Sequence, residues 1–322
     1  MLKVGLVGVG HFGKNHIRCH KLGKFELVGF FDINKELSDN IEKEFEIKQF
    51  ESLEALMAVV DVIDVVVPTS SHFEVASTAL KAGKHVFIEK PVTSTREEAL
   101  ELKRIADERN LKIQVGHVER FNPAFFAIKD KITDPKFIEL HRLGQFHPRN
   151  KDVPVVLDLL IHDIDIVLHL VKSKIKNVYS SGVAIISDTP DITNARVEFE
   201  NGCVANMTSS RISMKVMRKI RLFQETAYVT IDFLKKESEI IQVLPVKEPV
   251  TDPFALILDL GDDREKKQFF IDKPDIQEHN AIVEELNSFH DSIVNNTTPV
   301  VSIEDGYKAL DLALLIIEKL NN

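Results

Sequence analysis

The stretch VGLVGVGHFGKNH (residues 4–16) places three glycines, Gly8, Gly10 and Gly13, where an apolar run gives way to polar residues. The spacing G-x-G-x-x-G occurs in dinucleotide-binding loops, and glycine-rich turns that bind nothing are also common. The residues that follow distinguish the two cases, because a dinucleotide-binding loop belongs at the start of a series of alternating strands and helices.

Such an alternation extends over the first 118 residues. Short apolar runs predict buried parallel strands at 3–9, 25–32, 62–69, 85–90 and 112–118, with a weaker candidate at 47–50. Amphipathic stretches between them predict helices, for which Asn34, Ser52, Ser71 and Ser94 are the expected N-caps. This alternation predicts right-handed βαβ units in an α/β, doubly wound parallel sheet of the Rossmann type.

The pattern changes after residue 120. Helices are expected at about 123–132 and 154–172, with an extended segment at 137–144 between them, and strand-like runs fill 176–248. Residues 249–275 are the least regular, and two amphipathic helices are expected at 276–295 and 303–320. We therefore expect a Rossmann domain over 1–120 and an α+β domain with a large, mostly antiparallel sheet over 121–322.

Composition excludes several classes of protein. The 322 residues carry 50 acidic and 41 basic side chains, a net charge of -9, which disfavours nucleic acid and anionic membrane as partners. The two cysteines, Cys19 and Cys203, form neither a metal-binding spacing nor a disulfide framework. No apolar run approaches the ~20 residues of a membrane span. We expect a cytoplasmic protein.

In this context the glycine loop is predicted to hold a dinucleotide. Gly8 permits a tight turn, Gly10 lets the backbone approach a pyrophosphate, and Gly13 lets the first helix pack closely. Asp32 ends the second strand, where its carboxylate can accept hydrogen bonds from the ribose hydroxyls. A 2′-phosphate there would be repelled by about 4 kcal/mol at ~4 Å and an effective dielectric of ~20. NAD is therefore favoured over NADP, although the nearby Lys35 keeps NADP possible.

Two further stretches could carry chemistry. Glu89, Lys90 and Pro91 end the fifth candidate strand (85–90, counting the weaker one at 47–50), at the edge where doubly wound sheets bind ligands. Lys90 could hydrogen-bond a reacting oxygen, or it could be an ordinary surface lysine. Proline 91 suggests a cis peptide bond.

The second stretch is VVLDLLIHDIDIVLHL (155–170). On a helix, Asp158, His162, Asp165 and His169 form one polar stripe, with Asp163 away from it. A carboxylate one turn from an imidazole can support a general base, and a buried structural network is the alternative. No metal site is expected: His16 and His20 share a helix face without a carboxylate or thiol at metal-site spacing, which suggests surface or interface residues.

GLVGVGHFGKNH, VVVPTSSHFEVASTALKAGKHVFIEKP, VGHVERFNP and LDLLIHDIDIVLHL together resemble the Gfo/Idh/MocA oxidoreductases over nearly the whole chain. The resemblance implies a hydride transfer between nicotinamide and a secondary alcohol of a sugar, with Lys90, Asp158 and His162 as the catalytic group. His162 would take the hydroxyl proton, Lys90 would hydrogen-bond the reacting oxygen, and Asp158 would position His162 and the substrate.

The resemblance also implies binding residues and an assembly. Cofactor-binding residues would be Gly8, Gly10, His11, Phe12, Gly13, Asp32, Thr69, Ser70, His72, Glu89 and Lys90. Substrate-binding residues would be Arg120, Asn122, Asp158 and His162. The sheet of the second domain would form subunit contacts, giving a homodimer or homotetramer.

Within the family, GHVERFNPA is similar to members that act as UDP-N-acetylglucosamine 3-dehydrogenases, which suggests oxidation at C3 of a UDP-linked amino sugar. The basic segment 211–221 could bind the diphosphate, or it could be a solvated strand–loop–strand. Two other functions stay open. One is a biliverdin-reductase-like reductase, which would not use the Asp158–His162 pair, and the other is a non-catalytic dinucleotide-sensing regulator, which would lack the lysine and histidine.

Overall fold

The computed structural model describes residues 1–147, 153–246, 255–259, 261 and 264–320. The chain forms two compact units, Met1–Phe121 with His279–Leu312, and Asn122–Glu278 with Ala313–Asn322. The change of unit after Phe121 lies one residue beyond the expected boundary. The sequence predicts two continuous domains, 1–120 and 121–322. In the structure, residues 279–312 belong to the first unit instead.

Sheet A of the first unit is parallel and has the order β2-β1-β3-β4-β5. Its strands are β1 (Lys3–Val7), β2 (Glu26–Phe31), β3 (Val62–Val65), β4 (His85–Glu89) and β5 (Ile113–Gly116). All five lie within the main runs expected from sequence. The weaker candidate at 47–50 forms only an isolated parallel bridge between Gln49 and Phe30. The predicted doubly wound Rossmann sheet is confirmed.

Helices alternate with these strands: α1 (His11–His20), α2 (Lys35–Phe45), α3 (Leu53–Met57), α4 (His72–Lys81) and α5 (Arg96–Arg109). Helix α8 (Ala281–Val294) joins the same unit from much later in the sequence. Asn34 and Ser52 cap α2 and α3 as predicted. One predicted cap is wrong: Thr95 rather than Ser94 caps α5, through a capping box with Glu98. Ser71 occupies the N-cap position of α4 as predicted, but its side chain makes no capping bond.

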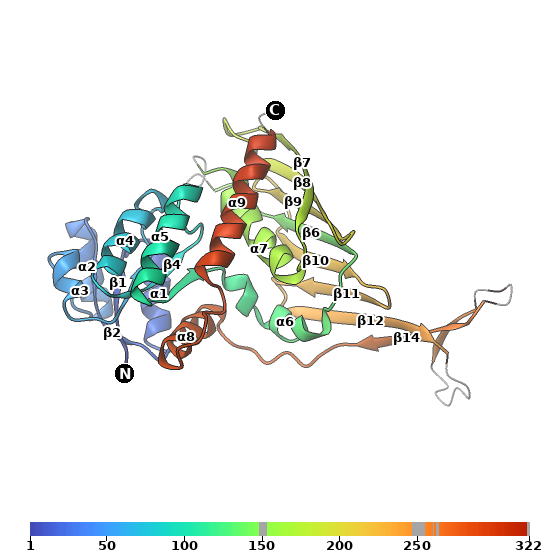
Figure 1. Cartoon of the computed structure of the whole chain (residues 1–322), viewed down its shortest axis with the longest axis horizontal. Coiled ribbons are helices and arrows are strands. Elements are labelled where there is room, and N and C mark those ends of the chain that lie inside the picture. The colour runs from blue at the N-terminus through green and yellow to red at the C-terminus, as the bar shows by residue number, and fades with distance from the viewer. Residues whose placement is uncertain (148–152, 247–254, 260, 262–263, 321–322) are drawn as a thin grey trace. The chain divides into compact units, whose positions relative to one another are not determined.

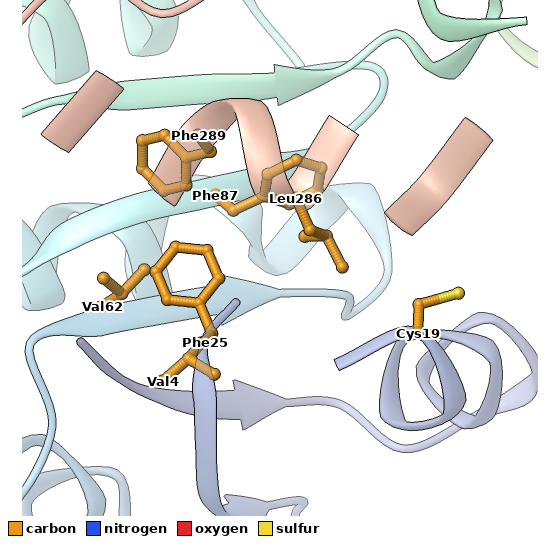
Figure 2. Close-up of a cluster of buried hydrophobic side chains, with 7 residues drawn as sticks. All are labelled: Val4, Cys19, Phe25, Val62, Phe87, Leu286 and Phe289. Carbon is orange, nitrogen blue, oxygen red and sulfur yellow. The ribbon is translucent and has the colours of Figure 1, made fainter. Parts of the chain in front are cut away.

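One hydrophobic cluster joins the sheet to helix α8. Figure 2 shows Val4, Val62 and Phe87 of the sheet packed toward Leu286 and Phe289 of α8. Residues 279–312 lie far from the rest of the first unit in the sequence. They belong to it because α8 supplies two large apolar side chains to its core.

The second unit is built on sheet B, with the order β13-β14-β12-β11-β10-β6-β9-β8-β7 among the described residues (Figure 1). Its strands are β6 (Phe137–Leu143), β7 (Ile175–Val183), β8 (Ile192–Phe199), β9 (Val204–Ser210), β10 (Met217–Phe223), β11 (Ala227–Asp232), β12 (Glu237–Pro245), β13 (Leu256–Leu258) and β14 (Lys267–Asp272). Only the β6–β9 pair is parallel among the described pairs, so the predicted mostly antiparallel sheet is confirmed.

The predicted hairpin at Asn201–Gly202 joins β8 and β9, and Gly202 has a positive φ of 85°. The region expected to be irregular, 249–275, contains β13 and β14, and part of it lies outside the described residues. The helix expected at 123–132 is reduced to α6 (Pro123–Phe126) and a 3₁₀ turn, Lys129–Lys131. The helix expected at 303–320 is α9 (Ile303–Leu320), which passes from the first unit into the second.

The helix expected at 154–172 has two parts. Residues Val156–Leu160 form a π-helical turn, and α7 (Ile161–Leu170) continues from it. Figure 1 shows α6 and α7 along one side of sheet B. Among the helices that the structure describes, none combines the length and apolar character needed to cross a membrane.

Candidate functional site

The glycine loop has three glycines for three different reasons. Gly8 has a positive φ of 93°, and a Cβ on it would lie 2.6 Å from the carbonyl oxygen of Val66. A Cβ on Gly13 would lie 2.2 Å from the carbonyl oxygen of Gly8, so helix and loop are packed too closely for a side chain there. A Cβ on Gly10 would have no described atom within 4 Å. The loop is therefore closed by Gly8 and Gly13 and open at Gly10.

The open position coincides with the N-terminus of α1. Gly10 is the N-cap, no side chain caps the helix, and the first turn contains no acidic residue. Uncapped N–H groups and the helix dipole make this a favourable place for a phosphate. His11 and Phe12 follow directly and are exposed, Phe12 to 63%. The loop thus fits the pyrophosphate of a dinucleotide, as the sequence predicts.

Asp32 lies beside this loop at the end of β2. One of its carboxylate oxygens accepts a hydrogen bond from the backbone N–H of Val9 (2.8 Å), and the other accepts one from the N–H of Asn34 (2.8 Å). The carboxylate is only partly buried. It is therefore fixed in place and still has accepting capacity for hydroxyl groups.

The carboxyl ends of β3 and β4 carry the next group of predicted residues. Thr69 and Ser70 lie in a 3₁₀ turn before α4, Thr69 partly buried and Ser70 exposed. His72 is buried, and its ring nitrogens lie 2.9 Å from the carbonyl oxygens of Val67 and Pro91. Burial lowers the pKa of His72, while the two carbonyls oppose that shift. His72 thus joins the loops after β3 and β4, which is a structural contribution to this edge.

Glu89 is the last residue of β4 and Lys90 follows it, and both residues are partly buried. The backbone N–H of Lys90 donates to the Glu89 carboxylate at 3.1 Å. The peptide bond between Lys90 and Pro91 is cis, as the sequence suggested.

Arg120 and Asn122 lie where the chain leaves the first unit. Arg120 is buried, donates to the carbonyl oxygen of Val300 (3.2 Å) and lies 3.5 Å from the Asp305 carboxylate. Asn122 caps α6 and donates to the carbonyl oxygen of Phe233 at 3.2 Å. Both side chains stabilise their own units, and a role in substrate binding stays a prediction.

In the second unit, Asp158 lies in the π-helical turn and His162 in the first turn of α7. Both are partly buried, whereas Asp163 and Asp165 are buried. π-helical turns interrupt helices frequently at functional sites. The π-helical turn therefore marks the segment that contains Asp158 and His162. This turn was not predicted from the sequence, because a helical period does not reveal a hydrogen bond between residues i and i+5.

Two further side chains of α7, Asp163 and His169, make structural contacts. Asp163, which the helical wheel placed away from the stripe, accepts two hydrogen bonds from the buried Arg142 of β6, at 3.0 and 2.7 Å. His169 packs edge-to-face on Phe125, with ring centroids 6.0 Å apart. These contacts hold α7 on its own unit.

The basic segment 211–221 is largely used within the second unit. Arg211 is buried and donates to Asp191 (2.9 Å), Thr189 (3.1 Å) and the carbonyl oxygen of Val153 (2.7 Å). Lys219 pairs with Asp232 and Arg221 with Glu139. These contacts favour the structural interpretation of the segment over a diphosphate site.

The interpretation of His16 and His20 as surface or interface residues is wrong. Both are buried, at 1% and 2% exposure, and both contact the buried carboxylate of Asp64 on β3. The spacing of four residues was visible in the sequence, but their carboxylate partner lies more than forty residues away and only the fold reveals it.

The comparisons with known proteins show the family to which this chain belongs. Residues 2–117 match the model of the oxidoreductase family with an NAD-binding Rossmann fold, and residues 134–229 match the Gfo/Idh/MocA C-terminal domain. A UDP-N-acetylglucosamine 3-dehydrogenase from Acidithiobacillus ferrooxidans is 38% identical over 234 residues, covering 72% of this chain and 74% of that protein.

Two solved structures extend the likeness to the whole chain. The structure of the Acidithiobacillus ferrooxidans dehydrogenase has a TM-score of 0.88 at 31% identity and covers 99% of this chain and 97% of its own. A scyllo-inositol dehydrogenase from Lactobacillus casei, with bound NAD(H) and scyllo-inositol, has a TM-score of 0.78 at 22% identity, with 100% and 97% covered. The second likeness concerns the fold alone.

Proposed function

Because this chain belongs to the Gfo/Idh/MocA family of NAD-binding oxidoreductases, we propose that it oxidises a secondary alcohol of a nucleotide sugar, specifically C3 of a UDP-linked amino sugar. The observation that carries the proposal is the 38% identity to a UDP-N-acetylglucosamine 3-dehydrogenase, together with a structural likeness that covers 99% of the chain. A free sugar or an inositol is the broader alternative within the same reaction class.

The cofactor that we propose is NAD rather than NADP. The open space at Gly10 and the uncapped start of α1 fit a pyrophosphate. Asp32, fixed by Val9 and Asn34, would accept hydrogen bonds from the adenosine ribose and would repel a 2′-phosphate. Thr69, Ser70, Glu89 and Lys90 would border the nicotinamide half, at the carboxyl ends of β3 and β4.

The reaction would need three side chains of this chain. Bound NAD supplies the hydride acceptor. Lys90 would donate a hydrogen bond to the reacting oxygen, His162 would take the hydroxyl proton at a ring nitrogen, and Asp158 would orient His162 and the sugar. The proposal requires that Lys90 and His162 reach the same hydroxyl-bearing carbon. Removal of the proton by His162 makes the departure of hydride from that carbon easier.

We also propose a homodimer or homotetramer in the cytoplasm. The face of sheet B opposite α7 has a groove of about 830 Å³ lined by side chains of both charges, among them Glu139, Lys219, Arg221 and Asp232. A second copy could cover such a face. Both cysteines are free and buried, which is compatible with a reducing compartment. Light scattering after gel filtration would measure the assembly.

The substrate is tested by turnover and by product. Purified protein would be incubated with NAD and with UDP-N-acetylglucosamine, UDP-N-acetylgalactosamine, the free amino sugars or inositols, while NADH is followed at 340 nm. We expect NADH from a UDP-amino sugar only, and loss of the H3 signal in the proton NMR spectrum of the product. Turnover of free sugars or inositols without UDP-sugars would contradict the proposal, and reduction of biliverdin in the same screen would favour the reductase alternative.

A further inference from the structure

A row of four hydrogen-bonded side chains runs from the core of the first unit to the end of β4. Its members are His20, Asp64, His16 and Glu89. Helix α1 places His16 and His20 one turn apart on the face that covers sheet A. Asp64 of β3 is fully buried, and one of its oxygens lies 2.8 Å from Nδ1 of His16 and 2.8 Å from Nε2 of His20. A carboxylate inside a parallel sheet is costly unless it is paired, so the two histidines account for its presence there.

His16 links the buried Asp64 to Glu89 at the carboxyl end of β4. Its second ring nitrogen, Nε2, lies 3.1 Å from the carboxylate of Glu89. Since carboxylates only accept hydrogen bonds, a ring placed between two of them donates from both nitrogens and carries a positive charge. Burial by itself lowers the pKa of His16, but the charges of Asp64 and Glu89 raise it well above its ordinary value. Burial would raise the pKa of Asp64, but its contacts with His16 and His20 lower it to about 2.

Glu89 is the partly exposed end of this row of side chains. Its side chain is 21% exposed, and its second oxygen accepts the backbone N–H of Lys90 at 3.1 Å. The space that it occupies is left by Gly116 of β5, where a Cβ would lie 3.0 Å from the Glu89 carboxyl carbon. The Glu89 carboxylate is thus held by its contact with His16, and it has room because residue 116 is glycine.

The three buried residues also satisfy the spacing of a metal site, since one ligand atom from each of His16, His20 and Asp64 lies within 4.8 Å of the others. The distances between these atoms favour hydrogen bonds among the three side chains over a metal site. Both nitrogens lie at hydrogen-bond distance from one carboxylate oxygen, and the remaining nitrogen of His16 is directed to Glu89.

We propose that His16 is a positioning residue for the cofactor: its imidazolium holds Glu89 in place at the carboxyl end of β4 and compensates the charge of that carboxylate. This inference rests on the proposed function, in which the nicotinamide lies at that edge. The oxidised ring is positively charged and the reduced ring is neutral, so a negative charge nearby favours NAD⁺. By compensating Glu89, His16 shifts the relative affinity toward NADH.

The experiment compares the dissociation constants of NAD⁺ and NADH at pH 8 in wild type, His16→Gln and His20→Gln. Glutamine is neutral, so His16→Gln removes the positive charge between Asp64 and Glu89. The negative charge of Glu89 is then no longer compensated. We expect the ratio of the NAD⁺ constant to the NADH constant to fall by about tenfold. His20→Gln is the matched control, because it removes a buried histidine that contacts Asp64 but not Glu89, and it should leave the ratio unchanged.

A second route reaches Glu89 without altering a histidine. In Gly116→Ala the new Cβ must displace the Glu89 carboxylate from its place beside His16, so the ratio of the two constants should change, by a smaller factor than in His16→Gln. Gly144→Ala is its control, since the nearest atom to a Cβ there is 3.9 Å away. If His16→Gln does not fold, this variant and the nitrogen-15 spectrum of the wild-type histidines, in which one buried ring should carry two protons at pH 8, decide the question.

The outcomes separate this inference from the proposed function. A wild type that turns over substrate, combined with an unchanged ratio in both His16→Gln and Gly116→Ala, overturns the inference and leaves the function in place. An equal change in His20→Gln, or a change of the wild-type ratio on treatment with EDTA, also overturns it, in favour of general structural damage or of a metal site. A wild type that binds neither NAD⁺ nor NADH overturns the proposed function as well.

Discussion

The carboxylate of Asp32 accepts a hydrogen bond from the backbone N–H of Val9 at 2.8 Å, and so fixes the end of β2 to the glycine loop. One residue thereby adjoins both places that a dinucleotide would need, the turn for its pyrophosphate and the strand end for its ribose. The strand end and the loop are 23 residues apart in the sequence, and the parallel pairing of β1 with β2 brings them together.

Replacement of Asp32 tests the cofactor preference. In Asp32→Asn the repulsion of a 2′-phosphate is removed, and the charge-assisted hydrogen bonds to the ribose are weakened. We expect the preference for NADH over NADPH to fall by about tenfold or more, measured by fluorescence titration with both nucleotides. Asp39→Asn, an exposed position on α2, makes the same charge change and should leave the preference intact. A wild type that binds NADPH more tightly would refute the assignment.

The glycine loop allows binding and folding to be tested separately. Gly10→Val places a side chain where no described atom lies within 4 Å, so we expect normal thermal stability and loss of NADH binding. Gly13→Val forces a Cβ against the carbonyl oxygen of Gly8, so we expect a lower melting temperature as well. Differential scanning fluorimetry with and without NADH measures both effects. Unchanged NADH affinity in Gly10→Val would exclude this loop as the pyrophosphate site.

The catalytic assignments predict a loss of turnover without a loss of cofactor. Lys90→Ala and His162→Ala should each lower kcat by about a hundredfold or more, because each removes a group that acts on the reacting hydroxyl, while the dissociation constant of NADH changes little. Steady-state kinetics with the substrate found in the screen would measure this. His169→Asn, on the same helix as His162, is the control and should keep its activity. A wild-type rate in either alanine variant would contradict the role of that residue.

The stability of the first unit should depend on the protonation of His16. Because Asp64 and Glu89 raise the pKa of His16 well above its unfolded value of about 6.5, the protonated ring stabilises the fold fully below that value. This contribution is lost as the pH rises through the folded pKa. The difference in unfolding free energy between wild type and His16→Gln should therefore be largest near pH 6 and shrink toward pH 10 in urea titrations. A constant difference would contradict a charged His16.

The buried pair of Arg142 and Asp163 predicts a stability effect in the second unit. Asp163→Ala removes the Asp163 carboxylate from the buried Arg142 guanidinium, and we expect a loss of about 3–5 kcal/mol in unfolding free energy. The double variant Arg142→Met/Asp163→Leu should recover much of this loss, because no uncompensated charge remains. Urea unfolding followed by circular dichroism measures both. Equal losses in the single and double variants would contradict this account.

Much of the fold and part of the site follow from local sequence patterns. The five strands of sheet A, the caps at Asn34 and Ser52, and the bounds of α9 depend on residues within a few positions of one another. The proposed role of the glycine loop also follows from local sequence, since Gly8, Gly10 and Gly13 lie within six residues at the junction of β1 and α1. Each of these features is determined by backbone conformation and hydrophobic period, which act over short distances along the chain.

Other features were decided only by the tertiary structure. Asp64 reads as one polar residue in an apolar strand, and nothing near it in sequence indicates that two histidines of α1 neutralise it. Residues 279–312 join the first unit because Leu286 and Phe289 complete its core. The local pattern places Asp163 away from the polar stripe, but only the fold shows that its partner is Arg142 of β6. In each case the physical cause is burial: a charge or an apolar face removed from water needs a partner, and chain folding alone decides which distant residue supplies it.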